Sequence, residues 1–383
     1  MPAEIVEKWL GTGKSACLAG RSLRPLAHPA LPGTPLAVQR GQAEAFILTD
    51  SAGGRWVLKK FHQGRALEPG YLRSVGSLLP DHESFTAGTE RHVLSASDVG
   101  RGQGSYGPAE LAGWIDGTIL MPRVPGMDWA SIADDLRDGS LKLDSPQRLA
   151  IVSALASCIH CLEDGGIAHR DLSSGNVFID LVTGQIWLID FDSLYHPSLR
   201  MPRATTCGTV GYTAPYAWRR EAPDARATWC GTADRYALAL LITEILVLQQ
   251  GGPLSAEGGI FDQEDLRKRT GPSITFAQGV LKSQWPEHFS LFSAAIDSKG
   301  FEDCPTPSTW ARASQGCEYE APTLAEWETA GEDDFEDILG RRRPAAPLWP
   351  APSLAELPDV EIELPARPVA LVTLPEDPWE TVQ

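Results

Sequence analysis

The stretch of sequence that decides the fold is HRDLSSGNVFIDLVTGQIWLIDFD, residues 169–192. Three of its oxygen-bearing side chains, Asp171, Asn176 and Asp190, fall on predicted loops between short apolar strands. Carboxylate and amide oxygens are the hard ligands that Mg²⁺ prefers, and a further carboxylate can accept a proton from an attacking hydroxyl group. The residues alone therefore predict a site equipped for phosphoryl transfer.

The same stretch resembles the protein-kinase catalytic loop H-R-D-L-x-x-x-N followed by the magnesium-binding D-F-G. Four further segments are similar to kinase motifs and follow one another in the family's order. They are the strand Trp56–Phe61 with its lysine, the hinge Met121–Gly126, the segment Gly208–Pro215, and Asp234–Ala239 at the start of an apolar helix. The chain thus resembles the eukaryotic-like (Hanks-type) protein kinases over the range 36–315.

The resemblance implies an α+β, bilobal protein-kinase-like fold. Such a fold has a small antiparallel β N-lobe and a mainly helical C-lobe, and here we expect an extended C-terminal tail in addition. The expected parts are an N-terminal extension 1–35, the N-lobe and hinge 36–126, the C-lobe 127–315 and an acidic, proline-rich tail 316–383.

Negative charge is concentrated at the C-terminal end of the chain. The 383 residues carry a net charge of −17, with 50 acidic side chains against 33 basic ones. Residues 316–383 hold 16 of the acidic residues, only four arginines and ten prolines. Such a composition buries little apolar surface, which favours an extended tail. An acidic chain is poorly suited to a phosphate backbone, so we expect no nucleic-acid partner.

The sequence carries no pattern typical of secretion or membrane insertion. The first ten residues lack a basic start followed by an apolar stretch, and the longest apolar run, Tyr236–Leu248, is too short to span a membrane. The seven cysteines are scattered and odd in number, which indicates reduced thiols rather than a disulfide framework. We therefore expect a cytoplasmic protein with no membrane partner.

By resemblance, the N-lobe and hinge bind ATP. The residues expected to contact it are Gly41, Gln42, Ala43, Lys59, Met121, Pro122 and Val124. Lys59 would hold the α and β phosphates, beneath a turn in which only Gly41 remains of the usual three glycines. Met121 would be the gatekeeper residue. Pro122 lacks an N–H, but its carbonyl would face the adenine amine, and Val124 would offer both an N–H and a carbonyl.

A kinase lysine of this type pairs with an acidic residue on a helix, and two glutamates compete for that role. Glu68 lies nine positions after Lys59 but precedes Pro69, which disfavours helical geometry at residue 68. The segment that begins at Glu90 resembles the E-x-x-[IV]-L phrase of the kinase C-helix. We therefore predict Glu90 as the partner of Lys59, with an inserted helical segment near Leu72. The alternative for Glu90 is a solvated position on a helix face.

The resemblance also assigns catalytic roles in the C-lobe. Asp171 would orient the acceptor hydroxyl and take its proton. Asn176 and Asp190 would bind Mg²⁺, with Mn²⁺ as an alternative metal. Lys59 and Glu90 complete the expected catalytic set.

The segment that follows Asp190 is expected to regulate the site. Thr209 resembles the threonine that hydrogen-bonds the catalytic aspartate of kinases. Thr205 and Thr206 are candidates for phosphorylation opposite Arg170. The alternative is that Thr205 and Thr206 are ordinary loop residues without a regulatory role.

Three positions depart from the family pattern. Ser173 stands where protein kinases usually have a lysine that touches the transferred phosphate. Asp192 replaces the glycine of D-F-G, which makes the backbone less permissive there. Tyr216 replaces the glutamate of A-P-E, and Thr306 stands where its arginine partner would be, so both charges are lost together.

These residues favour a Mg·ATP-dependent serine/threonine protein kinase. A pseudokinase scaffold that binds partners through its C-lobe and tail, and a small-molecule kinase, are the alternatives. The phrases D-L-S-S-G-N-V-F-I-D and L-I-D-F-D-S-L-Y-H-P resemble a bacterial kinase subfamily associated with type-2C protein phosphatases and von Willebrand factor A proteins. That resemblance implies a protein substrate, one of these proteins as a partner, and a role in stress signalling.

Overall fold

The computed structural model describes residues 2–315, except for residue 41, residues 101–108, 204, 206, 220–221 and 256–258. The described residues belong to one compact unit that spans Met1–Pro344. The predicted acidic tail therefore lies outside the described residues. So do Gly41 of the expected phosphate turn and Thr206 of the expected activation segment.

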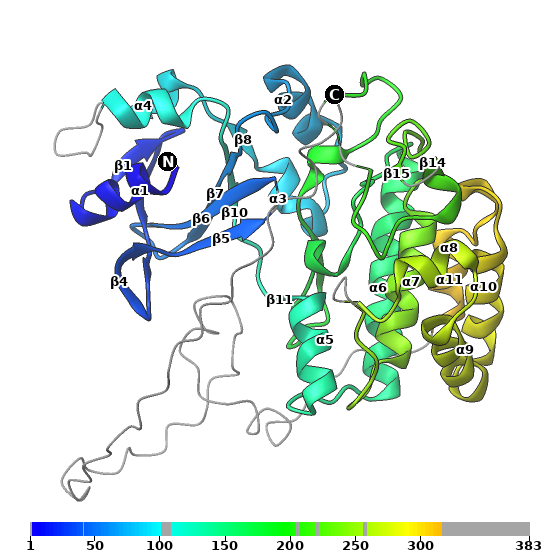
Figure 1. The fold of residues 1–383 in the computed structure, drawn as a ribbon. Helices are drawn as coiled ribbons and strands as arrows, with labels where there is room; N and C mark the ends of the chain where they lie inside the picture. Colours follow the sequence, from blue (N-terminus) through cyan, green and yellow to red (C-terminus); the bar gives the residue numbers. More distant parts are fainter. Residues whose placement is uncertain are drawn as a thin grey trace, which may run out of the picture. The chain divides into compact units, whose positions relative to one another are not determined.

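The N-lobe is built on an antiparallel β-sheet (Figure 1). Its strands are β1 (Ala16–Leu18), β2 (Arg21–Pro25), β5 (Ala37–Arg40), β6 (Ala43–Asp50), β7 (Arg55–Phe61), β8 (His92–Val93), β9 (Val99–Gly100) and β10 (Ile119–Pro122). They follow the order β8-β10-β7-β6-β2-β1-β9, and β5 also pairs with β6. A separate hairpin joins β3 (Ala27–His28) to β4 (Leu31–Pro35). The central strand β7 carries Lys59 opposite Ala45 of β6 and Ile119 of β10.

The expected N-terminal extension 1–35 is wrong: residues 2–35 are part of the N-lobe. Helix α1 (Pro2–Gly11) packs against the sheet, and β1 and β2 are part of it (Figure 1). The long strand β6 makes this possible, because β5 pairs with its first half, up to Phe46, while β2 pairs with its second half, from Leu48. Trp9 and Leu23 are fully buried in the core that this arrangement creates.

Three further helices belong to the N-lobe. They are α2 (Pro69–Leu78), α3 (Thr86–Thr89) and α4 (Ala109–Ile115), with 3-10 turns η1 (Glu83–Phe85) and η2 (Ala96–Asp98) between them. Helix α2 is the inserted segment predicted near Leu72, and it begins with Pro69 in its first turn, where no N–H is needed. The phrase after Glu90, in contrast, is not helical. It forms β8, because Val93 pairs with Ile119 at the edge of the sheet.

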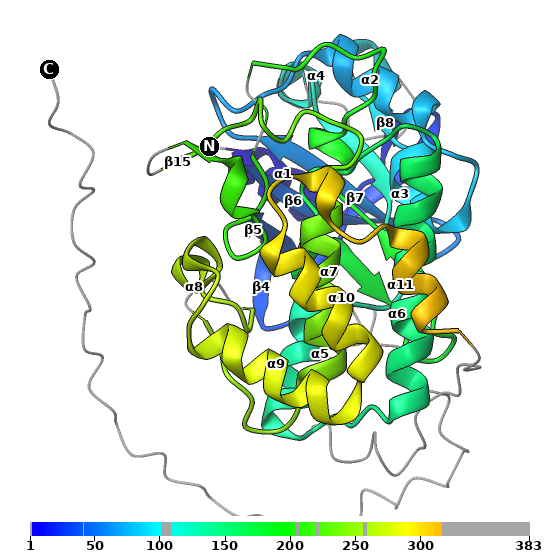
Figure 2. The same ribbon diagram turned by 90° about the vertical axis from the view of Figure 1, so that its right-hand side faces the viewer.

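The C-lobe is mainly helical (Figure 2). Its helices are α5 (Trp129–Asp138), α6 (Ser145–Asp164), α7 (Arg235–Val247), α8 (Gln263–Lys268), α9 (Pro272–Gln284), α10 (Pro286–Asp297) and α11 (Pro307–Ala313). Helix α7 is almost wholly apolar and forms the centre of the lobe, with α9 and α10 packed over it (Figure 2). Asp144 starts α6 with a capping box to Gln147.

Short strands and turns of the C-lobe position the loops that matter for function. They are β11 (Met127–Asp128), β12 (Val177–Ile179), β13 (Ile186–Leu188), β14 (Trp218–Arg219), β15 (Ala222–Pro223), η3 (Ser174–Asn176), η4 (Phe191–Ser193), η5 (Pro215–Ala217) and η6 (Phe301–Asp303). Gly126, with φ of +81°, lets the chain pass from the hinge to β11, because a Cβ there would overlap the backbone of Ile179.

The bilobal α+β fold with a small antiparallel N-lobe and a helical C-lobe is therefore confirmed. Within the described part of the chain, no helix combines the length and apolar character needed to cross a bilayer. The six cysteines in that part all carry free thiols.

Candidate active site

The loop between α6 and β12 carries Asp171, and a buried carboxylate of α7 holds it in place. Asp234, which caps α7, accepts hydrogen bonds from the backbone N–H of His169 at 2.6 Å and of Arg170 at 2.7 Å. Burial raises the pKa of Asp234, and the hydrogen bonds to its charged form oppose this rise. Arg170 adopts a left-handed backbone, with φ of 66°, which is rare outside glycine. Such strained backbone persists only where the surroundings enforce it, and here Asp234 does so.

Contacts from two sides position the Asp171 side chain and backbone. The Thr209 hydroxyl donates a hydrogen bond to Asp171 Oδ1 at 2.7 Å, so the predicted contact is present. Asn176 Nδ2 donates to the Asp171 carbonyl at 2.8 Å. Asn176 is in turn tied to the end of β13 by the hydrogen bond from the Ile189 N–H to its own carbonyl, at 3.1 Å. The structure thus brings Asp171, Asn176 and Thr209 together.

A cluster of four charged side chains lies at Lys59. Lys59 Nζ is 2.6 Å from Asp190 Oδ1 and also 2.6 Å from Asp192 Oδ2. Arg91 Nη2 lies 3.1 Å from the other oxygen of Asp192. The side chains of Lys59, Arg91 and Asp192 are only 11%, 4% and 10% exposed, whereas Asp190 is 28% exposed. Two cations and two carboxylates therefore balance one another in a nearly buried group.

The pKa values in this cluster differ because the two carboxylates have different neighbours. Burial, assisted by the charge of Asp192, raises the pKa of Asp190 to about 6, although Lys59 opposes the rise. Burial alone would also raise the pKa of Asp192, but Lys59 and Arg91 together lower it below the usual range. For Lys59, burial favours the neutral amine, yet the two carboxylates raise its pKa above the ordinary value.

The predicted ion pair between Lys59 and Glu90 is not formed. Glu90 caps the end of α3, and its side chain is exposed. The reason lies in the local fold: the phrase that follows Glu90 turns into strand β8, which leaves no helix to carry the glutamate toward Lys59. Asp190 and Asp192 take its place beside the lysine.

The predicted metal ligands Asn176 and Asp190 flank two adjacent strands: Asn176 directly precedes β12, and Asp190 follows the end of β13. Val177 pairs with Leu188, so the start of β12 lies beside the end of β13, where these two side chains emerge. Across the described residues, no three His, Cys, Asp or Glu side chains are grouped to hold a metal ion. Mg²⁺ is usually bound through one or two carboxylates together with substrate phosphates rather than by an all-protein cage. One carboxylate and one amide therefore fit a phosphate-bound Mg²⁺ and not a structural metal.

The structure describes six of the seven residues expected to contact ATP: Gln42 and Ala43 at the start of β6, Lys59 on β7, and Met121, Pro122 and Val124 on β10 and the hinge. Val124 is buried in one apolar cluster with Trp187, and Met121 packs against that cluster together with Phe178 of β12. The Pro122 side of the hinge is fixed to the sheet, since the Arg123 N–H donates to the Arg55 carbonyl at 3.0 Å. The hinge thus carries apolar side chains that suit the flat face of a purine ring.

Two residues at the end of the expected phosphate turn, Gln42 and Ala43, are described and contact the sheet. Ala43 begins β6 and is buried. The carbonyl of Gln42 accepts a hydrogen bond from the His62 N–H at 2.9 Å, which ties the turn to the end of β7.

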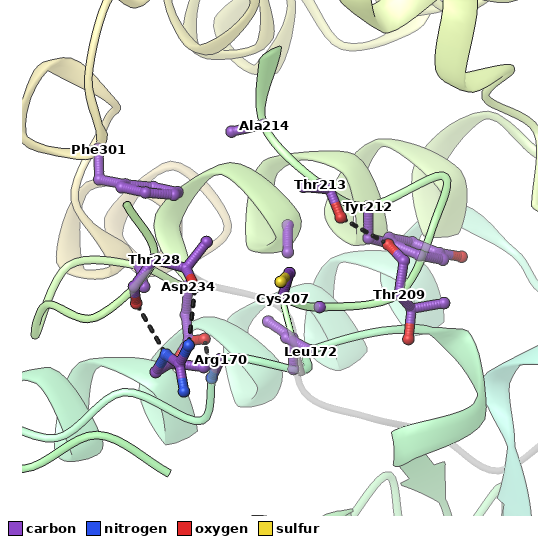
Figure 3. A pocket seen from close by; sticks show the side chains of 13 residues that line it. Arg170, Leu172, Cys207, Thr209, Tyr212, Thr213, Ala214, Thr228, Asp234 and Phe301 are labelled. Atoms are coloured by element: carbon purple, nitrogen blue, oxygen red, sulfur yellow. Dashed lines mark hydrogen bonds between the residues drawn. The ribbon is translucent and has the colours of Figure 1, made fainter. Parts of the chain in front are cut away.

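Arg170 reaches from the catalytic loop to the segment after Asp190. Its Nη1 donates to the Thr205 hydroxyl at 2.9 Å and to the Ser193 carbonyl at 2.7 Å. On the other side it donates to the Thr228 carbonyl and hydroxyl, both at 2.8 Å (Figure 3). Figure 3 also shows the small pocket between this arginine and the segment around Thr209, with Cys207 and Tyr212 in its wall. The structure thus places Thr205 against Arg170, as the prediction required.

Tyr216 and Thr306, the two uncharged residues that replace the expected ion pair, each contact uncharged neighbours. The Tyr216 hydroxyl lies 3.2 Å from Cys304 Sγ, and its ring packs edge-on against Phe301 at 4.9 Å. Thr306 caps helix α11 by accepting a hydrogen bond from the Thr309 N–H. Ser173, in the position of the missing lysine, is buried.

Sequence reasoning missed the role of Asp192, of Arg91 and of Asp234 in building the site. Asp192 was noted only as a loss of glycine, although a second carboxylate two positions after a metal ligand is itself a signal. Arg91 lies beside Glu90, and nothing in its local sequence marks it as a partner of Asp192. Asp234 was quoted within a motif, but its hydrogen bonds to the catalytic loop could not be inferred from spacing.

Comparisons with known proteins find similarity to protein kinases over part of the chain. A probable serine/threonine-protein kinase of Dictyostelium discoideum is 35% identical over 95 residues, 25% of this chain and 7% of that protein. A second one from the same organism is 33% identical over 131 residues, 33% of this chain and 9% of that protein. Citron Rho-interacting kinase of Mus musculus is 27% identical over 129 residues, 33% of this chain and 6% of that protein.

The chain spans less than a tenth of the length of these curated relatives. Among solved structures, the kinase domain of Mycobacterium tuberculosis PknI matches with a TM-score of 0.46 and 19% sequence identity, over 78% of this chain and 96% of that domain. No family model matches the sequence. The curated proteins named here, to which parts of this chain are similar, are protein kinases.

Proposed function

We propose that this chain is a protein kinase that uses Mg·ATP to phosphorylate serine or threonine hydroxyl groups of a protein substrate. The single observation that carries the proposal is the constrained position of Asp171, which Thr209, Asn176 and the Asp234-held loop fix in one place. A scaffold that only binds partners has no need for a fixed, partly exposed carboxylate beside a charged lysine cluster. The sequence similarity to serine/threonine-protein kinases supports the same class of activity.

In the proposed reaction, Asp171 orients the acceptor hydroxyl and accepts its proton. The hydroxyl oxygen forms a bond to the γ-phosphorus of ATP while the bond to the β–γ bridging oxygen breaks, and ADP leaves. Lys59 supplies positive charge to the phosphates. Asn176 and Asp190 would hold Mg²⁺, which neutralises phosphate charge when it is bound.

Several finer features belong to the same proposal. The substrate would be a protein, and a von Willebrand factor A protein or a type-2C protein phosphatase would be a partner, in bacterial stress signalling within the cytoplasm. These follow from the resemblance of the catalytic-loop phrases alone. Thr205 would be a phosphorylation site, because Arg170 already donates a hydrogen bond to its hydroxyl and could pair with a phosphate there.

The direct test uses the full chain with labelled ATP and Mg²⁺. We expect label to appear on the protein itself or on an added protein substrate, and to be lost in Asp171→Asn. The control is Asp164→Asn, the same chemical change at an exposed residue at the end of α6. Turnover only with a small-molecule acceptor would replace the proposal with a small-molecule kinase. A wild-type chain that binds no Mg·ATP would replace it with a scaffold.

A further inference from the structure

The lysine of the candidate site needs a carboxylate that holds it in position, and helix α2 cannot supply one. This helix is the inserted segment that precedes Glu90, and its sequence, PGYLRSVGSL, contains no acidic residue. Glu68 precedes it and is exposed, with an oxygen 3.5 Å from the Arg203 N–H on the segment after η4. Glu90 is exposed as well. The partner of Lys59 must therefore come from another element.

Asp192 of η4 is placed to be that partner, because its carboxylate contacts Lys59 directly. Its Oδ2 is 2.6 Å from Lys59 Nζ, and its Oδ1 is 3.1 Å from Arg91 Nη2. Each carboxylate oxygen thus faces its own cation, which fixes the orientation of the group. The three side chains are each at most 11% exposed, so water screens these contacts weakly.

Contacts with η1, α3 and α2 hold the turn that carries Asp192 and the residue just after it. Phe191 is buried and packs edge-on against Phe85, with ring centroids 6.1 Å apart and planes at 88°. It also contacts Gly88 so closely that a Cβ at that glycine would lie 2.7 Å from its ring. Just after the turn, the Leu194 carbonyl accepts a hydrogen bond from the Tyr71 hydroxyl of α2 at 2.7 Å.

We propose that Asp192 is the positioning residue for Lys59, in the role that the resemblance gave to Glu90, and that Arg91 holds Asp192 in place. This inference rests on the proposed function. It also has a structural consequence: the lysine partner Asp192 and the metal-ligand candidate Asp190 are two residues apart on one turn. The position of the lysine and that of the metal ligand are therefore coupled through the backbone of η4, and no carboxylate on a mobile helix is required.

The test compares Asp192→Asn with Glu90→Gln in the full chain, because the two assignments make opposite predictions. Each variant removes one negative charge with little change of shape, and Asp81→Asn, at an exposed residue, is the matched control. We expect Asp192→Asn to lower kcat/KM for ATP by about 10- to 100-fold, the range for losing a hydrogen bond to a charged group. Glu90→Gln and Asp81→Asn should stay within about twofold of wild type.

A second pair of variants separates positioning from mere stability. Arg91→Met removes the cation that orients Asp192 and should lower kcat/KM for ATP, whereas Arg91→Lys should restore most of it. A purely structural role for the cluster would lower the unfolding midpoint in both Arg91 variants without this recovery of kcat/KM. If Asp192→Asn does not fold, the Arg91 pair alone decides.

Calorimetric titration of Mg·ATP makes the two proposals distinguishable. A wild-type chain that binds Mg·ATP but phosphorylates nothing overturns the kinase proposal, while weaker binding in Asp192→Asn than in Glu90→Gln still supports the inference. Wild-type kinetics and binding retained in Asp192→Asn but lost in Glu90→Gln overturn the inference alone. Absence of Mg·ATP binding in wild type overturns both.

Discussion

At the scale of single residues, the site depends on how a few polar atoms orient one carboxylate. Asp171 can take a proton from a hydroxyl only if its oxygens keep a fixed direction, and the Thr209 hydroxyl supplies that direction from 2.7 Å away. The hydroxyl contacts the carboxylate and not the lysine cluster. Its contribution should therefore appear in the chemical step rather than in nucleotide binding.

Replacing Thr209 by valine should lower kcat about tenfold, because the variant keeps the shape of the side chain but loses a hydrogen bond to a charged group. KM for ATP should change little. Steady-state kinetics of phosphotransfer measure both values. Thr209→Ser keeps the hydroxyl and should retain most of the wild-type kcat, so equal losses in the valine and serine variants would contradict this role.

The sequence predicted the residues that chemistry constrains most tightly and missed those that depend on packing. Asp171, Asn176 and Asp190 could be found because their functional groups must occur in one local order. Asp192 and Arg91 could not, since the contacts of Asp192 with Lys59 and with Arg91 depend on where the chain turns after α3. The chain turns there because the two residues of β8 pair with β10. As a result, Glu90 precedes a strand and does not lie on a helix that faces Lys59.

At the scale of elements, helix α7 serves both as the centre of the C-lobe and as a support for the loops of the site. Near its end it carries Glu244, a buried carboxyl group. Its oxygens accept hydrogen bonds from the Tyr212 hydroxyl at 2.8 Å, the Trp129 indole at 3.2 Å and the Ile260 N–H at 2.9 Å. One side chain thus joins the segment after Thr209, the start of α5 and the loop before α8.

The buried position of Glu244 leads to a prediction for the dependence of stability on pH. Burial raises its pKa in the folded protein, although its hydrogen bonds oppose the rise. The folded state then holds a proton that the unfolded state releases, so the contribution of this group is full below the unfolded pKa and is lost as pH rises through the folded pKa. Urea unfolding of wild type and Glu244→Gln, from pH 4 to pH 8, should show wild type losing stability relative to the variant as pH rises. A constant difference across this range would contradict the prediction.

The strands within residues 2–35 could not be predicted from the sequence, because each of them is too short to show a periodic pattern of apolar residues. Strands β1 and β2 have only three and five residues, and they alternate with turns, so residues 1–35 gave no clear period. Their place in the fold comes from β6, whose eight residues are long enough to pair with two strands in succession. This is tertiary information that the local pattern does not contain.

A core substitution tests whether α1 is part of the N-lobe. Trp9 is fully buried, and its indole N–H donates to the Lys14 carbonyl at 2.9 Å. Trp9→Ala should lower the free energy of unfolding by about 3–5 kcal/mol, the range for removing a large aromatic side chain from a core. Chemical denaturation measures this value. Leu31→Ala, at a residue that is 54% exposed, should cost less than about 0.5 kcal/mol, and similar losses in both variants would mean that α1 does not belong to the core.

At the scale of the whole molecule, the cluster of Lys59, Arg91, Asp190 and Asp192 connects the two lobes. It also positions charged side chains of the candidate site. Lys59 and Arg91 come from N-lobe elements, while Asp190 and Asp192 come from η4 and the residue before it in the C-lobe. Because this contact is nearly buried, its loss leaves charge unpaired at the junction between the lobes. Catalysis and the stability of the junction therefore depend on the same four side chains.

The neighbouring lysines of β7 separate these effects. Lys59→Met leaves Asp192 with Arg91 alone and removes the cation that pairs with Asp190, so we expect Mg·ATP binding to be lost and the free energy of unfolding to fall by about 3–5 kcal/mol. Lys60 instead donates to the carbonyls of Trp114 and Asp116 within the N-lobe, at 2.6 and 2.8 Å. Lys60→Met should therefore weaken the N-lobe slightly but preserve Mg·ATP binding. Calorimetric titration and denaturant unfolding of both variants measure the two quantities, and equal behaviour of the two lysines would show that the charge at Lys59 neither joins the lobes nor holds the nucleotide.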